Sequence, residues 1–379
     1  MLLLEKMEGR NNMLQIKQRR VELDIARSFA IICVLLCHAT ESIYLLNKNG
    51  WARLSNQSRI FMIVSFTIGR LGVPIFLFLT GALILKKSFE TDDDVFKFYK
   101  KNLASLIITN SIWIVIYNIY FLINNQKDIV TNEFIIKELL LIKQVPLKHM
   151  WYFPVIIGLY IGLPFVSKII KTFSKKALSI LMVLIFISAF VLPMINVILA
   201  IIGIKDAYVS LLNISFLGGA YGLYVVVGYF LDSRSEHNRK TSIFIVMISI
   251  LCFIITCLFQ MLSYSKLSKK IDVYNVWYNF PFLLVCVAGI FKIIVNIDTS
   301  KMNEKIVSFF TFISKTSLAT FFLHIIIINI ITPHIASLKM MMPMKVVLLA
   351  GSTFLICVIL ESLLCKVKIV SKYVMLMEK

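Results

Sequence analysis

Ten long apolar stretches, separated by short joints that carry most of the charge, make up nearly the whole sequence. A helix that crosses a membrane needs about 20 apolar residues, and this 379-residue chain is 59% hydrophobic and only 16% charged. Soluble domains have about 45–50% apolar and about 25% charged residues. The pattern predicts an all-α, polytopic membrane bundle and excludes a disordered chain, a secreted disulfide scaffold and a soluble enzyme. The expected spans are 22–45, 60–85, 103–123, 150–167, 177–201, 209–231, 242–262, 274–295, 309–331 and 346–365.

The segments outside the spans are too short to form a soluble domain. We therefore expect a cytoplasmic N-terminal segment, 1–21, one membrane domain, 22–365, and a cytoplasmic tail, 366–379. The first apolar run is too long for the core of a signal peptide and has no small-residue cleavage site near its end, so it is expected to be retained as a span.

The net charge of +20 comes from 40 Lys and Arg against 20 Asp and Glu. In a soluble protein this excess would suggest nucleic-acid binding, but here the basic residues lie in the joints between spans. The two termini and the alternate joints hold 25 Lys and Arg, and the other joints hold 13. The positive-inside rule then places both termini in the cytoplasm. By this count, Arg27 and Arg70 are the basic residues left within spans.

Neither the cysteines nor the familiar short sequence motifs indicate a disulfide, a metal site or a known catalytic motif. All seven cysteines lie within or beside apolar runs, and none belongs to a CxxC pair or a Cys/His cluster. Neither a disulfide framework nor a metal site is therefore expected. The sequence also lacks the HExxH, GxSxG, P-loop and GxGxxG patterns.

The first span carries three polar side chains on one face. Asp24 and Arg27 are three residues apart, and His38 follows Arg27 by 11 residues, about three helical turns. An ion pair between Asp24 and Arg27 at the level of the cytoplasmic headgroups is the simpler interpretation of these two. His38 lies deeper, where polar side chains face a bundle interior or a wet cavity. The stripe therefore predicts a functional surface inside the bundle.

Arg70 lies well within the second span, which contains no acidic residue. A buried guanidinium needs a partner from another helix or an anionic ligand. Asp24 and Glu361 are the candidate structural partners. In the functional alternative, Arg27 and Arg70 grip phosphate groups of a ligand bidentately.

Three further residues have two interpretations each. His324, in the ninth span, is either a core histidine hydrogen-bonded across helices or a second polar group lining an acceptor cavity. His149 and Trp151 end the longest outer joint, 125–149. They either anchor this joint at the membrane interface or contact an acceptor.

Four stretches resemble motifs of the membrane acyltransferase 3 family, whose bacterial members O-acylate surface polysaccharides and peptidoglycan. The most specific is Leu23-Asp24-x-x-Arg27-x-x-Ala30, with His38 after ten intervening residues. Residue 28 is serine where the family often has glycine. Serine, like glycine, permits two helices to approach each other closely. The resemblance extends from about residue 20 to 365, and ten spans is the family's number. The other three stretches are 70–81, 149–160 followed by Pro164, and 314–324.

The resemblance implies transfer of an acetyl or succinyl group to a hydroxyl of a surface glycan or its lipid-linked precursor. Acetyl-CoA or succinyl-CoA would be a co-substrate, with no bound cofactor and no metal. The expected partners are the lipid bilayer, acyl-CoA and the glycan, with no nucleic acid. The expected location is the bacterial cytoplasmic membrane, which the chain crosses many times.

The resemblance also implies roles for individual residues. His38 would be the catalytic base or acyl-handling residue, since an imidazole titrating near neutrality can take a proton from a sugar hydroxyl. Arg27 would orient the donor, and Arg70 would contact a phosphate or the pantetheine carbonyl of acyl-CoA. Supporting roles are expected for Asp24 and His324, and acceptor-side roles for His149 and Trp151.

Three alternatives stay open at this point. A transporter or flippase for a lipid-linked sugar would use the arginines on the pyrophosphate, but such proteins often contain inverted repeats, and none is detected. A membrane-bound O-acyltransferase of the other large type would work with His324 and Asn329 and would not need His38. A sensor that has lost catalysis is the third.

Overall fold

The computed structural model describes residues 19–44, 51, 54–126, 130–204, 218–233, 239–266 and 278–376. Among these residues, eight helical spans are long and apolar enough to cross a membrane, and two shorter apolar helices accompany them. The long spans consist of α2 (Val21–Tyr44), α4 (Asn56–Arg70) with α5 (Gly72–Ile84), α6 (Asp92–Phe98) with the π-helix η1 (Tyr99–Leu103) and α7 (Ala104–Ile123), α9 (Tyr152–Thr172), α10 (Lys175–Phe186) with the π-helix η4 (Ile187–Val191) and α11 (Leu192–Ile201), α13 (Arg239–Lys266), α15 (Glu304–Ser337) and α16 (Met342–Leu364). The shorter apolar helices are α12 (Gly219–Leu231) and α14 (Pro281–Val295), and the remaining elements are α8 (Asn132–Leu139), η3 (Lys148–Trp151), η7 (Thr299–Lys301) and η8 (Val370–Val374).

These elements confirm the prediction of an all-α, polytopic membrane bundle, and each expected span overlaps an apolar helix. Parts of five predicted segments lie outside the described residues, namely 1–18, 45, 209–217, 274–277 and 377–379. The cytoplasmic placement of both termini stays a prediction.

The predicted start was wrong for the third span, which begins at Asp92 rather than at residue 103, whereas its predicted end at residue 123 is confirmed. A capping box starts this helix, with Thr91 Oγ1 accepting from Asp94 N at 3.3 Å and Asp94 Oδ2 accepting from Thr91 N at 3.0 Å. Helix α15, which corresponds to the ninth predicted span, likewise extends from Glu304 to Ser337, beyond both ends of the predicted range 309–331. Hydropathy marks the part of a helix that can lie in lipid, whereas caps mark where the helix ends.

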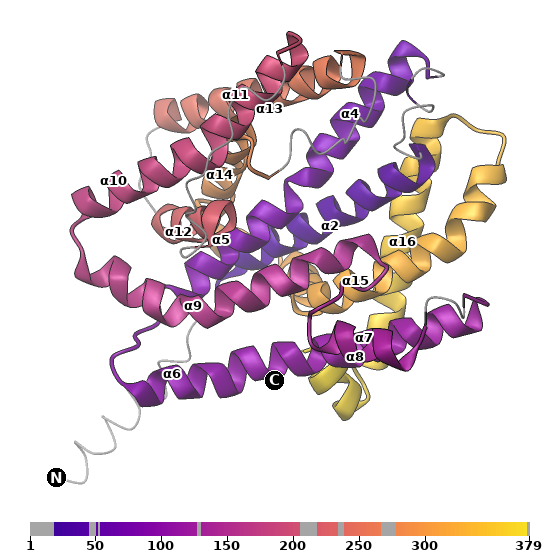
Figure 1. The fold of residues 1–379 in the computed structure, drawn as a ribbon, viewed down its shortest axis with the longest axis horizontal. Helices are drawn as coiled ribbons and strands as arrows, with labels where there is room; N and C mark the ends of the chain where they lie inside the picture. The colour runs from indigo at the N-terminus through magenta and orange to yellow at the C-terminus, as the bar shows by residue number, and fades with distance from the viewer. Residues whose placement is uncertain are drawn as a thin grey trace.

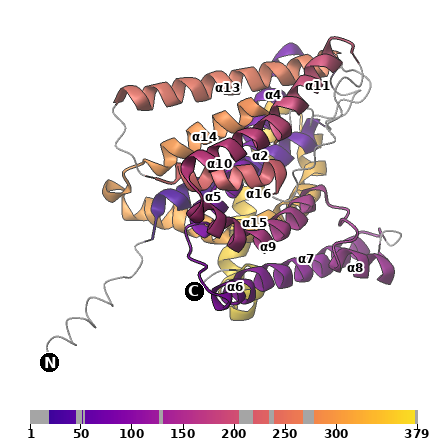
Figure 2. The same ribbon diagram turned by 60° about the vertical axis from the view of Figure 1, so that its left-hand side comes forward.

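Helix α2 lies in the middle of the bundle and packs against α4, α5, α14, α15 and α16. In both ribbon views, helices α11 and α13 lie at one edge, and α6, α7 and α8 lie at the opposite edge (Figures 1 and 2). Polar groups on α2 therefore face other helices rather than lipid, as the stripe on the first span predicted.

Two glycines bring α4 and α5 into backbone contact with α2. A Cβ at Gly69 would lie 2.6 Å from the Cα of Cys37, and one at Gly72 would lie 2.5 Å from the carbonyl oxygen of Ala30. The helix is interrupted between these glycines at Leu71, three residues before Pro74, whose missing N–H leaves the carbonyl of Arg70 without its usual donor. This break places Arg70 directly beside the polar face of α2.

An ionic cluster joins the helix ends at one side of the bundle. Asp232, which follows α12, accepts two hydrogen bonds from the Arg20 guanidinium, at 2.6 and 2.7 Å, and a third from Lys86 Nζ. The bonds to Asp232 raise the pKa of Arg20. Lys292 of α14 donates to the carbonyl of Leu231 at 3.3 Å and is only 9% exposed. The count that left only Arg27 and Arg70 within spans was therefore wrong, because Lys292 belongs to a buried apolar helix whose C-terminal turn reaches this cluster.

Candidate active site

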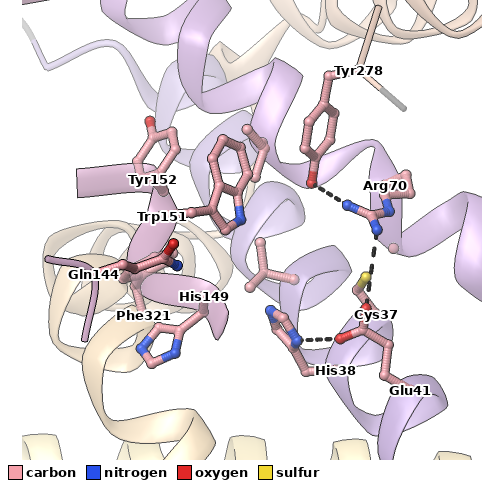
Figure 3. A pocket seen from close by; sticks show the side chains of 13 residues that line it. Cys37, His38, Glu41, Arg70, Gln144, His149, Trp151, Tyr152, Tyr278 and Phe321 are labelled. Carbon is pink, nitrogen blue, oxygen red and sulfur yellow. Dashed lines mark hydrogen bonds and ion pairs between the residues drawn. The ribbon is translucent and has the colours of Figure 1, made fainter. Parts of the chain in front are cut away.

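A cavity of about 330 Å³ opens beside α2, at the level of His38 (Figure 3). One wall comes from α2 and α4 and includes His38, Glu41 and Arg70. The opposite wall comes from the segment 144–152 that leads into α9, with Phe321 of α15 beside it. The cavity thus gathers four of the predicted site residues, namely His38, Arg70, His149 and Trp151.

His38 is oriented by Glu41, one helical turn further along α2. The Nδ1 atom of His38 lies 2.7 Å from Glu41 Oε2, and the two side chains are 17% and 18% exposed. An ionised carboxylate only accepts hydrogen bonds, so Nδ1 carries a proton, and in the neutral imidazole the lone pair is then on Nε2. Nε2 points away from Glu41 toward the space below Trp151 (Figure 3). This tautomer makes Nε2 the atom of His38 that can act as a general base.

Arg70 is held between a carboxylate and two aromatic rings. Its Nη2 atom lies 4.0 Å from Glu41 Oε1, and Nη1 donates to the Tyr278 hydroxyl at 3.1 Å. The guanidinium carbon lies 4.6 Å from the centre of the Phe66 ring and 5.2 Å from that of Tyr278, within cation–π distance. Glu41 therefore links the imidazole and the guanidinium in one charged group.

The predicted structural partners of Arg70 were wrong. Glu361 of α16 is fully buried and accepts a hydrogen bond from Thr320 Oγ1 at 2.6 Å. Asp24 lies toward the other end of α2. The carboxylate beside Arg70 is that of Glu41, whose spacing of three residues from His38 is visible in the sequence.

His149 is buried and held as one tautomer by Tyr117 of α7. The Tyr117 hydroxyl donates its single proton to the carbonyl of Phe322 at 2.9 Å, and it lies 3.1 Å from His149 Nε2. The hydroxyl oxygen must then accept from Nε2–H, which leaves His149 Nδ1 as a hydrogen-bond acceptor. The predicted acceptor-side residue therefore lines the cavity with its Nε2–H held by Tyr117.

His324 packs behind the cavity rather than lining it. Its ring centre lies 5.1 Å from that of His38 and 5.1 Å from that of His149, and Nδ1 lies 3.1 Å from the carbonyl oxygen of Thr320, to which it donates. This bond is made within α15, so the predicted bond across helices is not the one observed. His324 is thus placed to support the ring of His38. The residue Asn329, its suggested partner in one alternative, is exposed on α15 and does not line the cavity.

Asp24 and Arg27 form a separate polar cluster with α15. Asp24 accepts two bonds from Arg19, at 2.6 and 2.8 Å, and one from Ser314 Oγ at 2.6 Å. Arg27 Nη1 donates to the same Ser314 Oγ at 3.4 Å. Arg27 therefore lies outside the lining of the cavity.

Among the described residues, no group of three or more His, Cys, Asp and Glu side chains has the geometry of a metal site.

A family model described as an acyltransferase domain matches residues 20–362. The chain belongs to the acyltransferase 3 family. No curated protein and no solved structure matches the chain. The match confirms the resemblance seen in the motifs, and it makes this multi-pass bundle a membrane acyltransferase. The cavity contains an imidazole and a guanidinium, and groups of these two kinds can serve as the base and the oxyanion-stabilising cation in acyl transfer to a hydroxyl.

The prediction of site residues also missed polar groups of this acyltransferase's cavity and of its supports, including Glu41, Tyr117, Gln144 and Tyr278. Glu41 could have been found from its helical spacing to His38. The other three come from elements far away in the chain, so no local pattern marks them.

Replacing Tyr117 by Phe is expected to lower acyl transfer by about ten-fold. The change removes the hydroxyl that receives His149 Nε2–H, and a buried N–H without an acceptor costs about 1–3 kcal/mol. His149 can then shift its proton to Nδ1, which removes an acceptor from the cavity wall.

The rate of acyl transfer in membranes measures the effect of Tyr117→Phe. Tyr99→Phe is the matched control, because Tyr99 donates to the carbonyl of Ile161 away from the cavity. An equal loss in both variants, or none in Tyr117→Phe, contradicts the prediction.

Proposed function

We propose that this acyltransferase moves an acetyl or succinyl group from acyl-CoA to a hydroxyl of a surface glycan or its lipid-linked precursor, in the bacterial cytoplasmic membrane. The observation that carries the proposal is the shared cavity position of His38, oriented by Glu41, and Arg70. A base with a free lone pair beside a fixed cation suits the attack of a neutral hydroxyl on a thioester.

The reaction proceeds through one tetrahedral intermediate in this proposal. His38 Nε2 takes the proton of the acceptor hydroxyl as its oxygen forms a bond to the thioester carbonyl carbon. The Arg70 guanidinium stabilises the oxyanion that develops on the carbonyl oxygen. The carbon–sulfur bond then breaks, and the thiolate of coenzyme A receives the proton from His38. Glu41 stabilises the imidazolium that exists between the two proton transfers.

The position of Arg27 fits a donor that enters from the cytoplasmic side. Arg27 and His38 are 11 residues apart on α2, which is roughly 16 Å along the helix axis. Arg27 would orient the anionic part of acyl-CoA there, and Asp24 would hold Arg27 through Ser314. The pantetheine arm would extend from this cluster past Tyr152 to place the thioester beside His38.

The test is transfer of radiolabel from acyl-CoA in membranes that contain the full-length protein. Labelled acetyl-CoA and succinyl-CoA are supplied in parallel, with unacylated surface polysaccharide from cells lacking the protein as the acceptor. We expect label in the polysaccharide with one donor, and a matching mass difference between the polysaccharides of wild-type and deletion cells. Polysaccharides of identical mass, with no transfer from either donor, would refute the proposal and favour a transporter or flippase.

A further inference from the structure

The two walls of the cavity differ in chemistry. The wall of α2 and α4 carries the charged groups, Arg70 and Glu41. The opposite wall carries the neutral amide of Gln144, the indole of Trp151 and the imidazole of His149 (Figure 3). An anionic acyl-CoA matches the first wall, whereas a neutral, hydroxyl-rich molecule matches the second.

Gln144 lies at the start of a segment in which alternate side chains are buried. Val145 and Leu147 are buried in the hydrophobic core, and His149 is buried against Tyr117. Gln144 itself is exposed and lines the cavity. Its backbone is thus held by buried neighbours, and its side chain is exposed at the cavity.

The groups on this wall suit a sugar ring. A Gln amide offers N–H donors and a carbonyl acceptor together, and a hydroxyl can satisfy either. Trp151 packs in a stacked arrangement against Tyr278, with ring centres 5.5 Å apart and an interplanar angle of 26°, so its position is fixed. Flat aromatic surfaces with a few placed polar groups are typical of sites that orient small neutral ligands.

We propose that Gln144 is a specificity-determining residue, which hydrogen-bonds a second hydroxyl of the acceptor sugar while the reacting hydroxyl faces His38 Nε2. The sugar ring lies against Trp151, on the side of the cavity away from Arg70. This inference rests on the proposed function and adds to it the residue that selects the acceptor.

Gln144→Ala is the direct test, measured with full-length protein in membranes. The donor is the labelled acyl-CoA that the wild type uses, and the acceptor is unacylated polysaccharide from cells lacking the protein. We expect the KM for polysaccharide to rise about ten-fold, the loss of one good hydrogen bond, with a smaller change in kcat. The KM for acyl-CoA should stay within about two-fold, because the donor lies on the other wall.

Gln126→Ala is the matched control, since Gln126 is an exposed glutamine that precedes α8 and does not line the cavity. An unchanged KM for polysaccharide in Gln144→Ala overturns the inference, as does an equal rise in the KM for acyl-CoA. If Gln144→Ala fails to accumulate in the membrane, Gln144→Asn, which is one methylene shorter, gives the same comparison. Absence of transfer by the wild type would instead refute the proposed function.

Discussion

His38→Ala is expected to abolish acylation of the surface glycan, with a loss of at least about 1,000-fold in the rate of acyl transfer. Alanine removes the Nε2 lone pair that receives the hydroxyl proton, and it leaves no other described side chain in the same position. Glu41 and Arg70 would remain in the cavity without a base between them. Transfer of radiolabel in membranes and the mass of the surface polysaccharide both measure this loss.

Membrane abundance must be equal in the variant and the wild type for this result to be interpretable. His334→Ala is a suitable control, because His334 lies on the same helix as His324 but does not line the cavity. Full activity of His38→Ala would end its assignment as the base. It would also favour the alternative mechanism that uses His324, although His324 is buried behind the cavity.

The helices could be predicted from the sequence because lipid imposes a strong and local condition. A span needs about 20 apolar residues, and hydropathy therefore located each apolar helix within a few residues of its centre. The residues at which a helix begins and ends depend on local hydrogen bonds instead. Asp92 begins a helix because Thr91 and Asp94 cap it, so this helix starts before the apolar run that hydropathy detects.

The residues of the site likewise fall into two groups: those that could be predicted from the pattern of one helix, and those whose contacts depend on how the helices pack. Asp24, Arg27 and His38 could be predicted to share a face because helical periodicity relates them within one element. Arg70 could be predicted to need a partner, but its contact with Tyr278 joins residues 208 positions apart and depends on how the helices pack. Contacts of this kind leave no periodic signal in a single sequence.

The charge partner of Asp24 shows a further limit of predicting contacts from the sequence. Helical spacing favoured Arg27, three residues later, whereas the carboxylate binds Arg19 bidentately. Arg19 precedes the first residue of α2, Val21, so its guanidinium is free of helical geometry and can align both nitrogens with both oxygens. Helical spacing predicts which side chains within one helix can contact each other. It does not show whether a flexible side chain outside the helix, such as that of Arg19, makes a better contact.

Glu41→Gln is expected to lower kcat about 100-fold while the protein still inserts into the membrane. Glutamine has nearly the same shape, but it lacks the negative charge that orients His38 Nδ1–H and stabilises the imidazolium between the proton transfers. The substitution also leaves the Arg70 guanidinium without the carboxylate that lies 4.0 Å away. Glu133→Gln is the matched control, because Glu133 is exposed and pairs with Lys137.

The kinetic constants show through which neighbour Glu41 acts. Its Oε2 atom contacts His38 at 2.7 Å, whereas Oε1 is 4.0 Å from Arg70, so the closer and stronger interaction is with the imidazole. Loss of that interaction affects the proton transfers and should appear in kcat, with the KM for acyl-CoA changed by less than about three-fold. A rise in the KM for acyl-CoA with kcat preserved would mean that Glu41 serves mainly to position Arg70 for the donor. Wild-type activity in Glu41→Gln would remove the His38–Glu41 pair from the mechanism altogether.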